Sequence, residues 1–131
     1  MSTRRLASLV LVGLAGLGCG GDGGGPSGPE PGVLRVTLVT PNADDGAIML
    51  EMTGNVDSIE AATPYEMFMA RPTAGMTRVI LTGDLTDGLL LRVHVPDVTT
   101  EAPPGIQILQ VAARDSYLQR PLGGYGLVVQ P

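Results

Sequence analysis

The chain has 131 residues, a length that suits one domain, and carries a net charge of −5 with eight arginines and no lysine. An acidic, lysine-free surface argues against a nucleic-acid-binding protein and against electrostatic docking on anionic lipid. The single cysteine excludes an internal disulfide, so an apolar core must hold the domain together.

Residues 1–18 have the pattern of a secretory signal peptide. Arg4 and Arg5 form a basic start, and the apolar run Leu6–Leu17 is too short to span a membrane stably. A core helix or strand is the alternative, but the glycine-rich stretch that follows cannot pack against it. The sequence therefore predicts an exported protein. Removing residues 1–18 takes away two arginines and no acidic residue, which changes the net charge from −5 to −7.

The end of this segment, Leu14-Ala15-Gly16-Leu17-Gly18-Cys19, resembles the lipobox of bacterial lipoproteins. The resemblance implies cleavage before Cys19, acylation of its thiol and stable anchoring by two or three acyl chains, with the outer membrane of the cell envelope as the expected location. Gly18 fits the family pattern, whereas Gly16 stands where a leucine-like residue is usual. The alternatives are a secreted or periplasmic protein in which Cys19 is incidental, and a redox or catalytic thiol. Flexible glycine neighbours give that thiol nothing to lower its pKa.

The segment Gly20–Gly32, GGDGGGPSGPEPG, is predicted to be a flexible linker, because glycine, serine and proline dominate it and nothing apolar occurs. It resembles the linker that follows the acylated cysteine in many envelope lipoproteins. A glycine cluster can also form a phosphate loop, but no strand precedes this one and no GxxxxGK[ST] pattern exists. The sequence thus divides into a signal peptide (1–18), the acylation cysteine with its linker (19–32) and a folded domain (33–131).

Alternating apolar and polar residues predict about eight short strands after the linker, and no window of eleven residues has helical periodicity. The predicted strands are Val33–Thr40, Ala47–Thr53, Val56–Ala61, Tyr65–Ala70, Val79–Leu81, Leu89–Val95, Ile106–Ala113 and Tyr125–Val129. This pattern predicts an all-β fold, a single small antiparallel β-sandwich, with a closed barrel as the alternative. The stretch Val33–Val95 also loosely resembles the cohesin-type and immunoglobulin-like sandwiches of bacterial surface proteins, which implies a binding or scaffolding module.

The strongest apolar pattern lies in Met76–Val95, after a predicted turn at Arg71–Gly75. It predicts a β-hairpin around the turn cluster Gly83–Gly88. Period-two alternation places Leu90 on the outer face of the second run, together with Arg92 and His94. The buried face of that run is predicted to hold Leu89, Leu91, Val93 and Val95.

Candidates for catalysis or metal binding are scarce. His94 is the only histidine, and a Ser–His–Asp arrangement would need Ser58 or Ser116 brought to it. Asp44 and Asp45 lie in a predicted turn that lacks the ligand spacing of an EF-hand loop, so a turn is favoured over a metal site. The sequence predicts no catalytic residue, no metal site and no cofactor.

Methionines and tyrosines have structural roles in this interpretation. Met67 and Met69 are predicted to fill the core rather than to bind a soft metal. Tyr117 and Tyr125 are predicted to tie a loop through their hydroxyls. The alternative for the same region is a contact patch of Arg114, Tyr117 and Arg120.

Together these patterns predict a non-enzymatic, lipid-anchored envelope lipoprotein that acts as a binding or structural module. Its predicted partners are the membrane, through lipid on Cys19, and an unknown envelope protein; no nucleic acid and no small-molecule substrate is indicated. The alternative is a secreted subunit that joins an envelope assembly by strand addition. Val56–Ala61, a predicted edge strand, is the candidate for that pairing.

Overall fold

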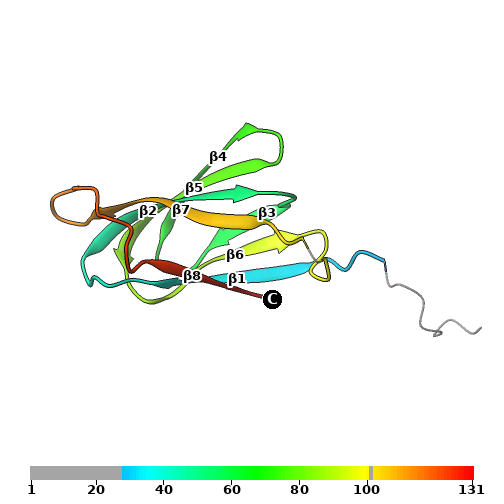
Figure 1. Cartoon of the computed structure of the whole chain (residues 1–131), viewed down its shortest axis with the longest axis horizontal. Coiled ribbons are helices and arrows are strands. Elements are labelled where there is room, and N and C mark those ends of the chain that lie inside the picture. Colours follow the sequence, from blue (N-terminus) through cyan, green and yellow to red (C-terminus); the bar gives the residue numbers. More distant parts are fainter. Residues whose placement is uncertain (1–27, 101) are drawn as a thin grey trace, which may run out of the picture.

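The computed structural model describes residues 28–100 and 102–131, which form two layers of β-strands (Figure 1). The strands are β1 (Gly32–Val39), β2 (Asp45–Thr53), β3 (Ser58–Ala61), β4 (Glu66–Thr73), β5 (Met76–Leu85), β6 (Gly88–Val95), β7 (Gly105–Ala113) and β8 (Gly126–Gln130). The predicted signal peptide, Cys19 and the first part of the predicted linker lie outside the described residues, so they stay predictions.

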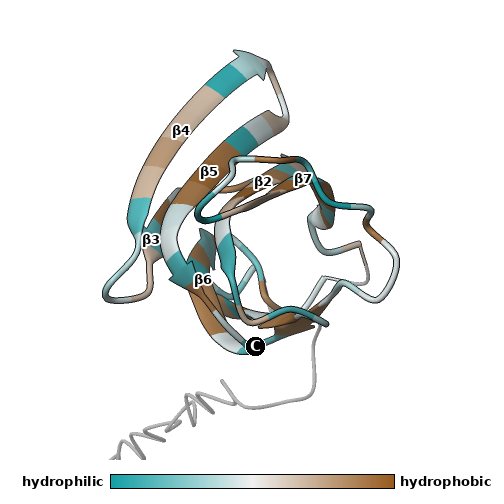
Figure 2. Ribbon diagram, turned by 90° about the vertical axis from the view of Figure 1, so that its left-hand side faces the viewer, coloured by the Kyte–Doolittle hydropathy of each residue, from teal (hydrophilic) through white to brown (hydrophobic). Residues whose placement is uncertain are grey.

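Each layer is a four-stranded antiparallel sheet. Sheet A has the order β3-β6-β1-β8, and sheet B has the order β4-β5-β2-β7. Figure 2 looks along the long axis of the molecule and separates the two layers. The predicted all-β fold, a small antiparallel β-sandwich, is confirmed, and the described strands form two sheets rather than one closed barrel. The relation to cohesin-type or immunoglobulin-like sandwiches stays a prediction.

The predicted hairpin over Met76–Val95 is wrong. Only Thr86 and Asp87 separate β5 from β6, yet β5 belongs to sheet B and β6 to sheet A. The chain crosses between the layers here, and Gly83 and Gly88 take φ values of +141° and +137° that favour glycine. The two apolar runs therefore face each other across the core, where each supplies the second layer that the other needs.

The consecutive strands that do pair are β4 and β5. Thr73 is opposite Met76, and the two residues between them, Ala74 and Gly75, form the turn. Gly75 has a φ of +75°, as such a tight turn requires. β4 thus continues through Arg71–Thr73, where the sequence predicts a turn. Its Pro72 is tolerated because β4 is an edge strand of sheet B.

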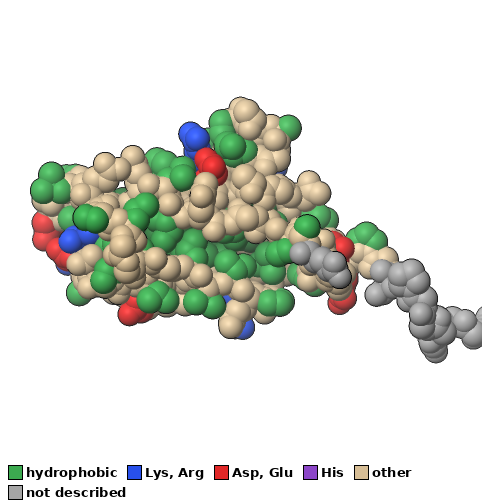
Figure 3. All heavy atoms as spheres, in the orientation of Figure 1, with side chains coloured by type: hydrophobic (Ala, Val, Ile, Leu, Met, Phe, Trp, Pro, Cys, Tyr) green, Lys and Arg blue, Asp and Glu red, His purple; other side chains and the backbone are tan. Residues whose placement is uncertain are grey.

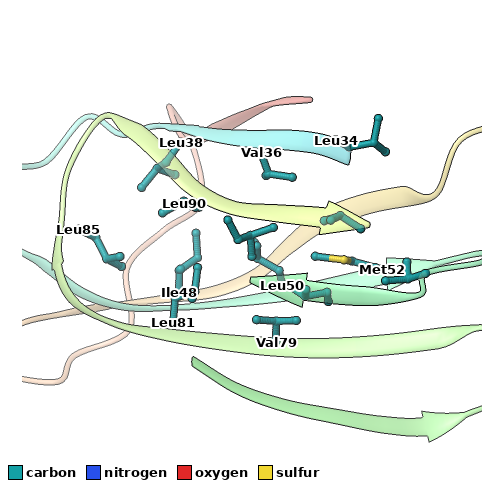
Figure 4. Packing of buried hydrophobic residues seen from close by; sticks show 14 of the residues in the cluster. Leu34, Val36, Leu38, Ile48, Leu50, Met52, Val79, Leu81, Leu85 and Leu90 are labelled. Carbon is teal, nitrogen blue, oxygen red and sulfur yellow. The ribbon is translucent and has the colours of Figure 1, made fainter. Parts of the chain in front are cut away.

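The core fills the space between the sheets, and leucine, isoleucine, valine and methionine side chains from both layers meet there (Figure 4). The predicted inward faces of β1 and β2 are confirmed. Their inward residues are all buried: Leu34, Val36, Leu38, Ile48, Leu50 and Met52. Leu85, at the crossing from sheet B to sheet A, is also fully buried.

A β-bulge changes which residues of β6 face the core. Val36 is opposite Leu91 and Thr37 is opposite Leu89, so Leu90 is an extra residue in the ladder. Leu90 turns inward and is 0% exposed, whereas Leu89 is only half-buried. The prediction that Leu90 lies on the outer face is wrong, because the bulge interrupts the alternation on which it depends.

A second bulge acts in the same way in β7. Met49 is opposite Gln110 and Leu50 is opposite Ile108, so Leu109 of β7 has no partner residue on β2. Ile108 packs against the core before the bulge, and Val111 is buried after it. The inward face therefore changes from even-numbered to odd-numbered residues along this strand.

Candidate functional site

The densest group of polar contacts lies at the end of the sandwich where the β1–β2 turn meets the β7–β8 loop. It comprises Thr40, Asn42, Asp44, Asp45, Arg120 and Tyr125, here called the Asp45 cluster. Asp45, the first residue of β2, is 0% exposed. Gly46 allows this packing, because a Cβ there would lie 2.5 Å from the Cα of Arg114.

Both oxygens of the Asp45 carboxylate have partners. Thr40 Oγ1 donates to Oδ2 at 2.6 Å, and the Tyr125 hydroxyl donates to Oδ1 at 2.8 Å. Arg120 Nε lies 2.9 Å from Oδ1 as an ion pair, although its direction is not that of a hydrogen bond. Asn42 Nδ2 in turn donates to the Tyr125 hydroxyl at 2.7 Å. A buried charge is tolerated when it is paired and hydrogen-bonded in this way.

The chain positions these groups through its backbone. Arg120 N donates to the carbonyl of Val111 at 2.8 Å, which fixes the β7–β8 loop against β7. Arg120 Nη2 also contacts the carboxylate of Asp44. Tyr125 stands immediately before β8, so the cluster joins the turn before β2 to the middle and to the last residue of the loop between β7 and β8.

The electrostatics of the cluster keep its donors protonated. Burial, with the hydrogen bond to Asp45, raises the pKa of the Tyr125 phenol above its usual value. Burial opposes the charge of Arg120, but the bond to Asp44 and the charges of Asp44 and Asp45 outweigh it and raise the pKa of that guanidinium. A protonated phenol and a fully paired carboxylate make a poor acid–base pair, so this geometry is that of a structural tie between loops.

The cluster tests the predicted loop tie of the two tyrosines, whereas the alternative contact patch stays a prediction: Arg114 and Tyr117 line one hollow, and Arg120 is not in its lining. Tyr125 ties the loop through its hydroxyl, as predicted, whereas Tyr117 is 83% exposed and does not. Arg120 is held by Asp44 and Asp45, and Arg114 lies 2.8 Å from Asp84. The buried role of Asp45 is missed by the sequence, because its adjacent turn residues have the composition of an exposed loop.

His94 lies on the outer face of β6, and the fold does bring one predicted serine beside it. Ser58 of β3 is directly opposite His94, whereas the Ser116 hydroxyl accepts from the amide of Leu118 in the β7–β8 loop. The acid nearest to His94 is Glu60, whose Oε2 lies 3.6 Å from Nε2. In the described part of the chain His94 Nε2 makes no hydrogen bond, so it does not hold the hydroxyl of Ser58 as the base of a catalytic triad would.

Of the five main surface hollows, one of about 360 Å³ has Asp84, Arg114 and Tyr117 in its lining, where Arg114 and Asp84 form an ion pair. The hollow of greatest volume among the five, about 440 Å³, lies between Asn55 and the β4–β5 hairpin, and Arg71 is the one ionisable residue in its lining. The five main hollows of the described residues are lined by residues other than His94. Across residues 28–100 and 102–131, no three His, Cys, Asp or Glu side chains converge as metal ligands would.

The edges of the two sheets are the remaining candidates for binding: β3 and β8 in sheet A, and β4 and β7 in sheet B. β3 pairs only with β6, as predicted for an edge, but it has just four residues. Arg71 Nη2 also donates to the carbonyls of Val56 and Asp57, at 3.2 and 3.3 Å, next to that edge. The segment predicted for strand addition is therefore short and partly capped.

β4 is a longer and more exposed edge than β3. It has eight residues, pairs only with β5, and flares away from the rest of the sandwich (Figure 2). Phe68 and Met69 are 59% and 48% exposed, so Met69 does not fill the core as predicted. Beside them lies a hollow of about 210 Å³ that includes Met49 and Ile80. Hydrophobic side chains are visible on the surface in the region of β4 (Figure 3).

The part of the chain that the structure describes holds no helix that is long and apolar enough to cross a membrane. Comparisons with protein families, with curated proteins and with solved structures found no match for this chain. Its function must therefore be inferred from its own residues and geometry.

Proposed function

We propose that the protein is a lipid-anchored lipoprotein of the cell envelope whose β-sandwich is a non-enzymatic binding or structural module. The observation that carries the proposal is the lipobox-like segment Leu14–Cys19, followed directly by a glycine- and proline-rich linker. A paired carboxylate at Asp45 and an unpolarised Ser58 beside His94 favour binding over catalysis.

The point where the chain enters the sandwich suits a tether. Glu30 N donates to Asp97 Oδ1 at 3.2 Å, and Val98 N donates to the carbonyl of Glu30 at 2.8 Å. Hydrogen bonds from the side chain and amide of Thr99, and then from Glu30 N, hold the pKa of Asp97 below its usual value. The entering chain is thus tied to the β6–β7 loop two residues before β1.

The two ends of the sandwich then have different surroundings. The chain enters at one end, and the β7–β8 loop lies at the opposite end of the long axis (Figure 1). Cys19 precedes Glu30 by eleven residues, which span at most about 40 Å when extended. Acylation at Cys19 would therefore keep the domain near the membrane and present the β7–β8 loop, with its exposed Tyr117 and Leu118, away from it.

Acylation is tested by expressing the full chain and a Cys19→Ser variant in a bacterium with an outer membrane. We expect labelled palmitate in the wild-type chain and none in the variant, because the variant lacks the thiol that accepts the acyl group. We also expect the wild type to enter the detergent phase on Triton X-114 partitioning. The palmitate label is the decisive measurement, because a chain that keeps its apolar segment Leu6–Leu17 would also enter the detergent phase without being acylated.

A Gly16→Leu variant is the matched control, because it restores the usual lipobox residue and leaves Cys19 in place. It should be labelled at least as well as the wild type. Equal label in wild type and Cys19→Ser, or equal partitioning with no label in either, would remove the lipoprotein proposal.

A second candidate function, joining an envelope assembly by strand addition, is favoured by the exposed β4 edge. An added strand gains main-chain hydrogen bonds along the edge and places alternate side chains against neighbouring pockets. The eight residues of β4 and the hollow beside Phe68 fit this mode better than the four residues of β3 do.

Strand addition is tested by placing a benzophenone amino acid at Phe68 in the full chain and irradiating intact envelopes. We expect one discrete crosslinked partner from position 68. The same probe at Val129, which is 38% exposed on β8 at the edge of sheet A, should not capture that partner. Capture of the same protein from both positions, or from neither, contradicts pairing at β4.

A further inference from the structure

The arginines of the described domain differ in how they are paired. Arg78, Arg114 and Arg120 lie within 3.1 Å of a carboxylate oxygen, and Arg71 donates to backbone carbonyls. Within residues 28–100 and 102–131, Arg35 and Arg92 are the two arginines whose guanidinium group forms neither an ion pair nor a hydrogen bond. In a chain with more acids than bases, two unpaired guanidinium groups need an explanation.

These two arginines stand directly opposite each other. Arg35 of β1 is paired with Arg92 of β6, and both are exposed on the outer face of sheet A. Side chains directly opposite in an antiparallel pair have Cβ atoms about 5 Å apart, and like charges there are destabilising. Arginine side chains are visible on the lower side of the molecule in Figure 3, the side on which β1 lies.

The residues opposite the two arginines on the neighbouring strands form no ion pair with them. Gln130 of β8 is opposite Arg35 on its other side and offers an amide donor. Glu60 of β3 is opposite Arg92, and its Oε2 approaches His94 Nε2 at 3.6 Å instead of forming an ion pair with Arg92. Glu60 is the acidic residue directly opposite Arg92, so its carboxylate competes with a bound anion for the Arg92 guanidinium.

We propose that Arg35 and Arg92 bind a doubly charged tetrahedral oxyanion, a phosphate monoester, on the outer face of sheet A. Each planar guanidinium can hold two oxygens of such a group in parallel hydrogen bonds, and two forks need more oxygens than one carboxylate has. A dianion also offsets both positive charges and removes the repulsion between them. The acidic net charge of the chain gives little long-range attraction, so binding depends on these contacts.

The proposal is tested by titrating the full chain in detergent with inorganic phosphate, against chloride at the same ionic strength. The Nε–Hε resonances of Arg35 and Arg92 should shift saturably with phosphate. Arg35→Gln or Arg92→Gln should weaken binding at least about tenfold, since each removes a charge-assisted pair of bonds. Arg78→Gln is the matched control on the opposite sheet and should leave the affinity unchanged.

Both positions are exposed, so the glutamine variants should fold, and their unfolding midpoints should equal or exceed that of the wild type without phosphate. No saturable shift, or an equal phosphate affinity in wild type and an Arg35→Gln/Arg92→Gln double variant, overturns the proposal. Vesicles of phosphatidylcholine with and without phosphatidic acid identify the source. Arginine-dependent binding to phosphatidic acid indicates a lipid headgroup, and phosphate binding without it indicates a soluble or glycan-borne phosphate.

Discussion

Leu90→Ala is expected to lower the free energy of unfolding by about 2–5 kcal/mol, the usual cost of truncating a buried leucine. Leu90 is 0% exposed and belongs to the core, although it stands between two other leucines on a strand that alternates elsewhere. Its removal leaves a cavity between the sheets that close-packed neighbours cannot fill. Urea unfolding of the full chain, followed by far-UV circular dichroism, measures the change.

Leu89→Ala is the matched control, since it removes the same atoms one position earlier. Leu89 is half-buried and lies opposite Thr37, so its truncation should cost about 1 kcal/mol or less. The order of the two costs tests the bulge. A small cost at Leu90 and a large one at Leu89 would mean that the strand alternates without interruption.

The β-bulges are the points at which the sequence no longer predicts which residues face the core. In β1 and β2 the inward residues follow a simple period of two, and the sequence predicts them correctly from Leu34 to Met52. In β6 and β7 one extra residue shifts the phase, and nothing in the local composition marks Leu90 or Leu109 as that residue. A bulge depends on the register with the partner strand, which only the folded sheet determines.

The crossing of the chain from β5 to β6 could not be predicted from the sequence for a related reason. Two apolar runs with a glycine-bearing turn between them have the same local pattern whether they pair side by side or face each other across a core. The choice depends on the other strands: β2 and β4 flank β5, while β1 and β3 flank β6. Only long-range packing separates a hairpin from a crossing between layers.

The Asp45 cluster could be predicted only in part. The sequence indicates that Asp45 lies in a turn and that Tyr125 ties a loop, but not that the two meet. Tyr125 and Asp45 are 80 positions apart in the chain, and Arg120 lies 76 positions from Asp44. These side chains meet only when the two sheets are stacked, so local sequence patterns cannot predict their contact.

Asp45→Ala is expected to be as severe as a core truncation, with a loss of about 2–4 kcal/mol in the free energy of unfolding. The carboxylate is fully buried, and its removal leaves Thr40, Arg120 and Tyr125 without the acceptor that each of them contacts. Unpartnered buried donors cost about 1–3 kcal/mol, and more when charged. The Arg120 side chain is 22% exposed and still has Asp44 as a partner, which limits the loss of stability.

Asp45→Asn separates charge from shape at this site, because asparagine keeps the size and one acceptor oxygen. We expect it to recover part of the stability lost in Asp45→Ala. A double-mutant cycle with Tyr125→Phe should give a coupling of about 0.5–3 kcal/mol, since the two side chains share a buried hydrogen bond of 2.8 Å. Additive losses in that cycle, or an Asp45→Ala variant as stable as the wild type, would mean that the cluster does not hold the β7–β8 loop to the sandwich. Such a result would leave that end of the domain to the apolar core alone, and Leu85 would then be its main anchor.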